Sequence, residues 1–286
     1  MFWRMIWFFG FFCFFLLIGC QPIENYAEEN TPVFTGNYAP ASLPFDGDLK
    51  VITWNIKFAQ EVEQAIKELQ EVERLQDADV LLLQEMNETA VNQIAQELQY
   101  NYVYFPASIH TENDSNFGNA ILSKWPLTDA EKIILPHENP KNEQMRIATK
   151  AITTIDDLEI ALYSVHTETI WLSGEKRLDQ VEEIIAHLDD RDFIFVGGDF
   201  NSATEGSVAT LDEKFAEANM ERISKNAEPT VEIGGIGFSA DHIFARDGVL
   251  IENGVWSDTK ASDHYPVWVT VSLEDITTHC APECTD

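Results

Sequence analysis

Apolar and polar residues recur with two different periods along the chain, and the period predicts the type of element. Short apolar runs and strict alternation are both typical of buried strands. Strands are therefore expected at residues 49–54, 80–85, 102–105, 146–155, 159–165, 193–198, 242–245, 249–255 and 266–271.

A spacing of three and four residues between apolar positions predicts helices between these strands. Val62, Ile66, Leu69 and Leu75 follow this spacing and predict an amphipathic helix over residues 59–77. Further helices are expected at residues 88–98, 174–188 and 207–218. Strands and helices alternate early and strands dominate late, which favours an α/β fold with two packed sheets and outer helices.

One predicted strand ends in two glycines followed by two polar side chains. The stretch reads Val196-Gly197-Gly198-Asp199-Phe200-Asn201. Because residues i and i+2 of an extended segment point to the same side, Asp199 and Asn201 can face one ligand. A Gly-Gly turn with Asp and Asn as turn residues is the alternative.

Other predicted strands also end in polar side chains. They are Asn55, Glu85, His166, the pair Asp241-His242 and the pair Asp263-His264. Each alone is compatible with a helix cap, a core histidine or a surface turn. Several acids at the ends of apolar strands are costly unless they share a cation or pair with a base. Carboxylate and carboxamide oxygens suit Mg²⁺ or Mn²⁺, and histidines can stabilise negative charge on a phosphate.

The composition limits the choice of partners. The 286 residues are 45% hydrophobic, which is ample for a core, and the formal net charge is −31. Tight binding to duplex DNA depends mainly on lysines and arginines that contact phosphates. The acidic balance therefore argues against a duplex-binding protein.

The N-terminus has the pattern of an export signal. Residues 1–19 contain one charged residue, Arg4, and an apolar run that ends before Cys20. Leu17-Ile18-Gly19-Cys20 resembles the lipobox of bacterial lipoproteins, which implies cleavage before Cys20, acylation of Cys20 and an extracytoplasmic, lipid-anchored protein. Gln21 would favour the outer membrane. An uncleaved membrane anchor is the alternative.

The remaining chain divides into three parts. Residues 20–46 contain four prolines and no periodicity, which predicts a flexible tether. A single domain is expected over residues 47–272, followed by an acidic tail at 273–286. Cys280 and Cys284 in this tail either close a small loop or remain free thiols.

Taken together, the strand-end motifs resemble those of the endonuclease/exonuclease/phosphatase superfamily over residues 49–272. The motifs, in family order, are Trp54-Asn55-Ile56, Leu83-Gln84-Glu85, Gly118-Asn119-Ala120-Ile121-Leu122-Ser123, Ser164-Val165-His166-Thr167, Gly198-Asp199-Phe200-Asn201, Asp241-His242-Ile243-Phe244 and Ser262-Asp263-His264-Tyr265-Pro266-Val267. The resemblance implies a four-layer αββα sandwich of two packed mixed sheets flanked by helices. It also implies Mg²⁺- or Mn²⁺-dependent hydrolysis of a phosphoester by in-line attack of water.

The resemblance assigns roles to the first group of residues. Glu85 is expected to be the main metal ligand, and Asn55 and Asp263 to complete the metal or phosphate shell. Asp199 is expected to orient or deprotonate the attacking water, and Asn201 to hold the scissile phosphate.

A second group is implied to act on the phosphate and the leaving group. His264, oriented by Asp241, is expected to stabilise the pentavalent transition state. His166 is expected to contact the phosphate or to assist the leaving group. Arg146 occupies the place of a phosphate-contacting arginine of some members.

The substrate is the open question. Asn55-Ile56-Lys57-Phe58 stands where repair nucleases usually carry Asn-x-Asn-Gly, and there is no basic stripe, so DNA repair is disfavoured. The leading hypothesis is a monomeric phosphodiesterase whose substrates include nucleic acid. A sphingomyelinase- or inositol-phosphatase-like enzyme and a non-catalytic acidic lipoprotein that binds cations or a partner are the alternatives. Residues 110–116 and 170–174 are expected to select the substrate.

Overall fold

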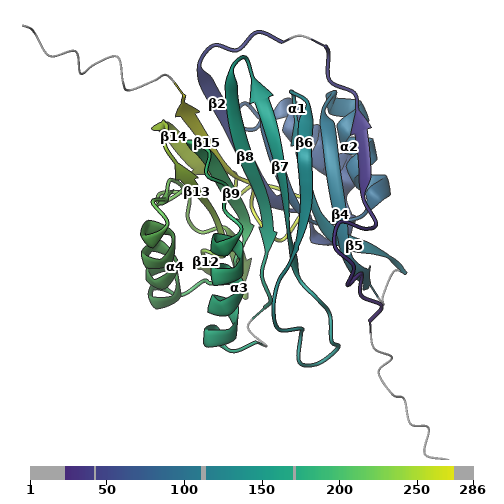
Figure 1. The fold of residues 1–286 in the computed structure, drawn as a ribbon, viewed down its shortest axis with the longest axis vertical. Helices are drawn as coiled ribbons and strands as arrows, with labels where there is room; N and C mark the ends of the chain where they lie inside the picture. Colours follow the sequence, from purple (N-terminus) through teal and green to yellow (C-terminus); the bar gives the residue numbers. More distant parts are fainter. Residues whose placement is uncertain (1–22, 42, 111–113, 170–171, 274–286) are drawn as a thin grey trace, which may run out of the picture.

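Two β-sheets packed face to face form the centre of the protein, and helices cover their outer faces (Figure 1). The strands and helices alternate along the first half of the chain, as the periodicity predicts. The computed structural model describes residues 23–41, 43–110, 114–169 and 172–273.

The first sheet has the strand order β1-β4-β5-β3-β2-β15-β14. The bounds are Phe34–Asn37 for β1, Asn101–His110 for β4, Ser115–Ser123 for β5, Val80–Met86 for β3, Asp48–Asn55 for β2, Val267–Ser272 for β15 and Val249–Val255 for β14. β2 and β3 are parallel, so their carboxyl ends lie at the same edge of the sheet.

The second sheet has the strand order β10-β13-β9-β8-β7-β6. The bounds are Glu221–Arg222 for β10, Asp241–Arg246 for β13, Phe193–Asp199 for β9, Leu158–His166 for β8, Ile147–Ile155 for β7 and Leu127–Ile134 for β6. β8 and β9 are parallel, and a separate hairpin joins β11 (Val231–Ile233) to β12 (Ile236–Phe238).

Three apolar cores separate the four layers. The helices are α1 (Val62–Glu71), α2 (Glu88–Leu98), α3 (Gly174–Ala186) and α4 (Glu205–Glu217). One core lies between α1, α2 and the first sheet, one between the sheets, and one between the second sheet and α3 and α4. Leu81 and Leu83 join the first core, whereas Val80 and Leu82 join the second, because successive side chains of a strand point to opposite faces. The predicted αββα sandwich is confirmed.

The two glycines before Asp199 lie in a strand and not in a turn. A Cβ on Gly197 would lie 2.7 Å from Cδ1 of Leu82 in the other sheet, and a Cβ on Gly198 would lie 1.9 Å from the carbonyl oxygen of Val165. Both glycines therefore serve close packing, which lets β9 approach its neighbours and places Asp199 at the strand end.

The helix predicted over residues 59–77 is shorter than expected. Phe58 and Ala59 have φ values of 52° in the 3₁₀ turn η1 (Lys57–Ala59), and α1 begins only at Val62. The helix ends before Val72, which is extended, in keeping with the lower helix propensity of β-branched residues. Leu75 is nevertheless buried. The apolar spacing therefore predicted the burial of this residue correctly but not its secondary structure.

The polar stretch at residues 110–116, expected to select the substrate, lies between two strands that reach into it from both ends. β4 extends to His110 and β5 begins at Ser115, while residues 111–113 lie outside the described part. β6 was not expected from the sequence. Its register shifts between Thr128 and Glu131, and this irregularity interrupts the alternation that marks other strands.

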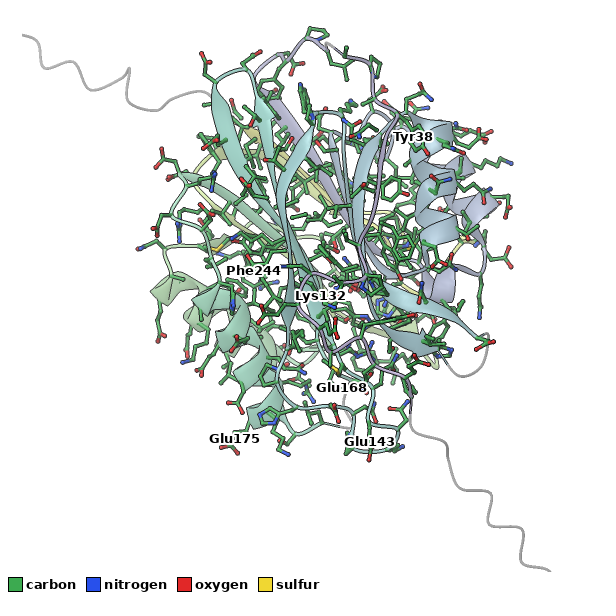
Figure 2. All side chains as sticks on the ribbon, turned by 45° about the vertical axis from the view of Figure 1, so that its right-hand side comes forward. Tyr38, Lys132, Glu143, Glu168, Glu175 and Phe244 are labelled. Atoms are coloured by element: carbon green, nitrogen blue, oxygen red, sulfur yellow. The ribbon has the colours of Figure 1, made fainter. Side chains whose placement is uncertain are left out.

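The segment expected to be a flexible tether packs on the domain from Ile23 onward. Ile23 is buried, the Tyr26 amide donates to the carbonyl of Ala107, and β1 pairs with β4. The side chain of Lys132, labelled in Figure 2, donates to the carbonyl of Tyr26. The tether prediction is wrong for this part, because backbone hydrogen bonds, which leave no periodic trace in the sequence, hold it in place.

Several predicted features fall where the structure gives no description. The signal at residues 1–19, Cys20, Cys280 and Cys284 lie outside the described residues. Among the helices of the described part, none is long and apolar enough to cross a membrane.

Candidate functional site

Strand ends from both sheets meet at one edge of the sandwich. Asn55 ends β2, His166 ends β8 and Asp199 ends β9, and His166 is paired in register with Asp199. Nδ2 of Asn55 donates to Oδ2 of Asp199 across 3.1 Å, which joins the two sheets directly. The structure thus brings together residues that lie more than 140 positions apart in the sequence.

Asn55 and Glu85 form the part of the site that belongs to the first sheet. Nδ2 of Asn55 lies 3.2 Å from Oε1 of Glu85, and the amide of Phe58 donates to Oε2 across 3.1 Å. Glu85 has a φ of 60°, a conformation that costs about 1–2 kcal/mol for a residue other than glycine. Such strain is retained where the surroundings impose it, and it is common in active sites.

The donor atoms of this pair suit a hard divalent cation. Oδ1 of Asn55 is buried and has no hydrogen-bond partner within the described structure. Burying a carbonyl oxygen without a partner costs about 1–3 kcal/mol. A cation held by this oxygen and by the carboxylate of Glu85 would remove the cost, and oxygen ligands of this kind fit Mg²⁺ or Mn²⁺.

His264 is held by Asp241 from behind. Nδ1 of His264 lies 2.8 Å from Oδ2 of Asp241, and Nε2 lies 3.8 Å from Oδ2 of Asp199. Thr230 donates its hydroxyl to the same oxygen of Asp241 and accepts the amide of Asp241. Sequence reasoning missed Thr230, because it lies in a segment without a strand-end signal.

The charges of this cluster are coupled. Burial opposes a charge on His264, but the carboxylates of Asp241 and Asp199 outweigh it and raise the pKa of His264 to about 10. Burial also raises the pKa of Asp199, against the effect of the His264 charge. Ligand atoms of Asp199, Asp241 and His264 lie within 4.8 Å of one another. In the metal-free arrangement this cluster is a coupled site for protons and charge, and the spacing of its ligand atoms would also allow it to hold a metal ion.

The Nδ1 atom of His166 has a cation as its neighbour, unlike the Nδ1 atom of His264. Nε2 lies 3.6 Å from Oδ2 of Asp199 and 4.0 Å from Oε1 of Glu85, whereas Nδ1 lies 3.3 Å from Nη1 of Arg146. Burial, and then the charges of Arg146 and His264, lower the pKa of His166 well below its usual range. His166 is therefore neutral at physiological pH in this arrangement.

Arg146 is held in turn by Glu168, whose position is labelled in Figure 2. Nε and Nη2 of Arg146 lie 3.2 and 3.3 Å from the two carboxylate oxygens. Burial would raise the pKa of Glu168, but the charge and hydrogen bonds of Arg146 lower it below the usual range. In this arrangement Arg146 contacts Glu168 and His166, and a direct contact with phosphate stays a prediction.

Asn201 lies beside Asp199 with its backbone in the left-handed region, at a φ of 49°. Its amide donates to Oδ1 of Asp199 across 2.9 Å, and its Nδ2 donates to the carbonyl of Thr167 across 3.1 Å. These bonds fix the carboxylate of Asp199 and keep the side chain of Asn201 at the rim of the site.

Asp263 is more exposed than the other predicted metal ligands. Its side chain is 50% exposed and pairs with Nζ of Lys57 at 3.1 Å. Ser262 donates its hydroxyl to the carbonyl of Asn55 and accepts the amide of His264, which ties this loop to β2. The structure thus places Asp263 at the mouth of the site, in an ion pair.

A row of rings borders the site on the side of His166. Phe58 lies 4.5 Å from His110 and 5.8 Å from Phe117, measured between ring centroids, and Phe117 lies 5.8 Å from His166. Phe58 and His110 are half-buried, so parts of these rings face solvent. No motif in the sequence predicts this row, because its members come from separate elements.

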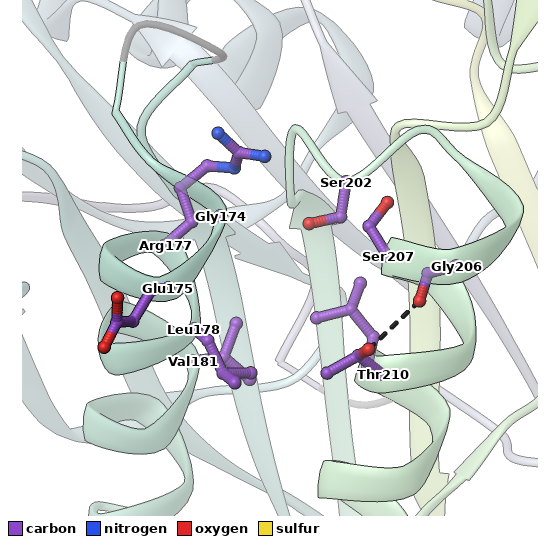
Figure 3. A pocket seen from close by; sticks show the side chains of 10 residues that line it. Gly174, Glu175, Arg177, Leu178, Val181, Ser202, Gly206, Ser207 and Thr210 are labelled. Carbon is purple, nitrogen blue, oxygen red and sulfur yellow. Dashed lines mark hydrogen bonds between the residues drawn. The ribbon is translucent and has the colours of Figure 1, made fainter.

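A separate pocket of about 300 Å³ opens between α3 and α4 (Figure 3). Arg177 and Ser207, from the first turns of these helices, and Ser202 supply its polar atoms, and Leu178 and Val181 supply apolar surface. None of the predicted catalytic or metal-binding residues lines it, so we do not assign the reaction to this pocket.

Comparisons with known proteins agree with this arrangement. A model of the endonuclease/exonuclease/phosphatase family matches residues 52–264. A UPF0294 protein of Vibrio cholerae is 27% identical over 241 residues, which cover 81% of this chain and 80% of that protein.

Solved structures share the fold at low sequence identity. An endonuclease/exonuclease/phosphatase of Beutenbergia cavernae has a TM-score of 0.65 at 20% identity and covers 79% of this chain and 72% of its own. TDP2 of D. rerio, complexed with a single-strand DNA product, has a TM-score of 0.62 at 18% identity and covers 79% and 99%. The family match spans most of the sandwich and the strand-end residues from Asn55 to His264. The chain belongs to the endonuclease/exonuclease/phosphatase family.

Proposed function

We propose that this protein is a Mg²⁺- or Mn²⁺-dependent phosphodiesterase. Membership of the family supports a phosphoester hydrolase. The assignment as a metal-dependent phosphodiesterase rests on the surroundings of Oδ2 of Asp199. This oxygen lies 3.1 Å from Nδ2 of Asn55, 3.6 Å from Nε2 of His166 and 3.8 Å from Nε2 of His264. One carboxylate oxygen thus faces the groups needed to hold a water and a phosphate.

The residues would divide the work of hydrolysis. Asp199, held by Asn55 and by the amide of Asn201, orients the attacking water and takes its proton. His264 carries positive charge towards the phosphate, and His166 donates a hydrogen bond from Nε2. Nδ2 of Asn201 is bonded to the carbonyl of Thr167, so Asn201 contacts the scissile phosphate after a local adjustment.

A divalent cation bound by Asn55 and Glu85 would supply Lewis acidity at a phosphoryl oxygen. Asp263 would join this shell only after it gives up its ion pair with Lys57. We therefore propose Asn55 and Glu85 as the primary ligands and Asp263 as a ligand recruited with the substrate or the metal.

The proposed substrates are phosphodiesters that carry a nucleobase. Nucleobases stack on aromatic side chains, and this is worth about 1–3 kcal/mol per base. The half-buried Phe58 and His110, which lie next to the buried Phe117 and His166, support such a substrate. TDP2 of D. rerio, of the same fold, is complexed with a single-strand DNA product. The formal net charge of −31 disfavours duplex DNA.

Hydrolysis of bis-p-nitrophenyl phosphate tests the activity. We expect turnover with Mg²⁺ or Mn²⁺, none in EDTA, and losses in the Asp199→Ala and His264→Ala variants. Asp79→Asn is the matched control, because it weakens an ion pair with Lys124, remote from the strand ends that form the site. Turnover by Asp199→Ala at the rate of the unaltered protein would refute the assignment.

A panel of substrates tests the specificity. It contains single-stranded DNA, duplex DNA, RNA, sphingomyelin and inositol phosphates. We expect single-stranded nucleic acid to be hydrolysed best. Preference for sphingomyelin or inositol phosphates would favour the alternative enzyme classes. No hydrolysis of any of these substrates would favour the non-catalytic lipoprotein.

We also propose that Cys20 is lipidated and that the protein is anchored to the outer membrane of a bacterium as a monomer. The sequence pattern before Cys20 supports this. Metabolic labelling with a fatty acid should fail in Cys20→Ser. Fractionation and light scattering in detergent then test the location and the monomer.

A further inference from the structure

The two ring nitrogens of His166 have different neighbours, and these neighbours determine which nitrogen carries the proton. Nδ1 lies 3.3 Å from Nη1 of Arg146, and Nε2 faces Asp199 and Glu85. A guanidinium has only donors, so Nδ1 must act as the acceptor. In a neutral imidazole the proton then resides on Nε2.

Arg146 can hold this position only because Glu168 holds it from the other side. Both carboxylate oxygens of Glu168 face Arg146, in the two-point geometry that suits a guanidinium. The side chains of Arg146 and Glu168 are 6% and 0% exposed, so solvent competes little for either group. A planar guanidinium bonded at two points leaves Nη1 directed at His166.

Within the described part of the chain, the hydrogen-bond partners of the Glu168 carboxylate are all donors. Besides Arg146, its Oε1 accepts from Nδ2 of Asn139 at 3.0 Å and from the amide of Thr169 at 2.7 Å. Every one of these contacts requires an acceptor at position 168. A carboxylate satisfies them, whereas the amide group of a glutamine would place a donor against a donor.

We propose that Glu168 and Arg146 are positioning residues that fix His166 as the Nε2-protonated tautomer. His166 then serves as a neutral hydrogen-bond donor to the substrate phosphate and not as a general acid. The role of His166 as a donor to the phosphate rests on the proposed function. The tautomer of His166 does not, because it is a property of the protein without substrate.

The tautomer can be observed by NMR in the full-length chain purified in detergent with EDTA. Histidines labelled with ¹⁵N give distinct long-range patterns for the two neutral tautomers and for the imidazolium. The sequence has seven histidines, and the signals of His166 are those lost in His166→Gln. We expect the Nε2-protonated pattern for His166 in the unaltered protein.

Variants test the role of the two positioning residues. Glu168→Gln should give a mixture of tautomers and lower kcat for bis-p-nitrophenyl phosphate about tenfold, with KM changed less than twofold, because donor contacts of this kind contribute about 1–1.5 kcal/mol. Arg146→Lys should behave alike, because an ammonium group cannot bond Glu168 at two points and still reach His166. Asp79→Asn should change neither the pattern nor kcat.

The outcomes separate the proposal from the proposed function. A protonated or Nδ1-protonated His166 in the unaltered protein overturns the proposal whether or not the protein is active. A single Nε2 tautomer retained in both Glu168→Gln and Arg146→Lys overturns it as well. If Glu168→Gln fails to fold, as judged by circular dichroism, Arg146→Lys and the pattern of the unaltered protein decide. An inactive protein with the expected tautomer and the expected change in variants refutes only the hydrolase.

Discussion

Two histidines lie next to Asp199, and the groups behind them are of opposite charge. Nδ1 of His264 is 2.8 Å from a carboxylate oxygen of Asp241, whereas Nδ1 of His166 is 3.3 Å from the guanidinium of Arg146. An anion behind an imidazole favours its positive charge, and a cation opposes it. The same side chain is therefore charged on one side of Asp199 and neutral on the other.

The charge on a strand-end histidine in this site depends on the residue that contacts its Nδ1 atom. Loss of contact with solvent alone would lower the pKa of each histidine. Only the neighbouring charge reverses the direction for His264. Replacements that alter this neighbourhood are the sharpest way to test the comparison.

The largest effect on kcat is expected for Asp199, which faces both histidines. Asp199→Asn removes the carboxylate that faces both histidines and should lower kcat about 10³-fold, within the range typical of a catalytic base. The measurement is the rate of hydrolysis of bis-p-nitrophenyl phosphate with Mg²⁺. Its circular dichroism should remain that of a folded protein. A loss below tenfold would contradict the role of Asp199.

A third histidine extends the comparison to a residue without a catalytic role. Burial and the charge of Arg222 lower the pKa of His242 to about 4. As the pH falls, His242 takes up a proton near pH 6.5 in the unfolded chain but only near pH 4 in the folded protein. The contribution of His242 to the free energy of unfolding is therefore unchanged above pH 6.5 and falls between pH 6.5 and 4. The expected loss is about 3 kcal/mol in the free energy of unfolding.

Urea unfolding of His242→Phe across this pH range tests the expectation. The ring would lie among Phe200 and Phe244, whose centroids are 6.1 and 6.3 Å from that of His242. The variant should lose less stability on acidification than the unaltered protein. Equal slopes for both proteins would show that His242 does not carry this pH dependence.

The two catalytic histidines should differ in their contribution to the rate. His264→Gln should lower kcat about 10²-fold, because it removes a positive charge directed at the phosphate. His166→Gln should lower kcat only about tenfold, because it removes a neutral donor. Both variants are measured with the same substrate at saturating Mg²⁺. A larger loss of kcat in His166→Gln than in His264→Gln would contradict these roles.

The smallest effect concerns the exposed mouth of the site beside His264. The ion pair of Lys57 with Asp263 has side chains that are 43% and 50% exposed, so it contributes little to stability. Lys57→Ala should tighten the apparent affinity for Mg²⁺ about two- to threefold at low salt, since a cation is removed near the site. Lys225→Ala, which breaks the exposed pair with Glu221, is the control. Weaker Mg²⁺ binding in Lys57→Ala would contradict the expectation.

The layers of the fold and most of the strand-end residues could be predicted from the sequence. Period-two apolar runs report buried strands directly, and Asn55, Glu85 and Asp199 follow such runs. The ion pair of Asp263 with Lys57 could not be predicted, because the exposed loop of Asp263 is placed by tertiary contacts and not by periodicity, and its role as a metal ligand stays a prediction.

The residues behind the histidines could not be predicted in the same way. Glu168 follows His166 by two positions, a spacing that could have drawn attention to it, but its partner Arg146 begins another strand region. Thr230 has no sequence signal at all, because its role depends on the distance to Asp241 in the folded chain. Side-chain networks of this kind appear only once the strands are in register.

The docked N-terminal segment would limit the distance between the folded domain and a membrane. Ile23 is buried, the side chain of Asn25 contacts the backbone of Met145, and Tyr26 bonds the strand that leads to His110. If Cys20 carries lipid, as we propose, three residue steps separate it from Ile23, a reach of about 10 Å. A lipid on Cys20 would then hold the surface around Ile23 within about this distance of the headgroups, because the docked segment leaves little slack between the lipid and the folded domain.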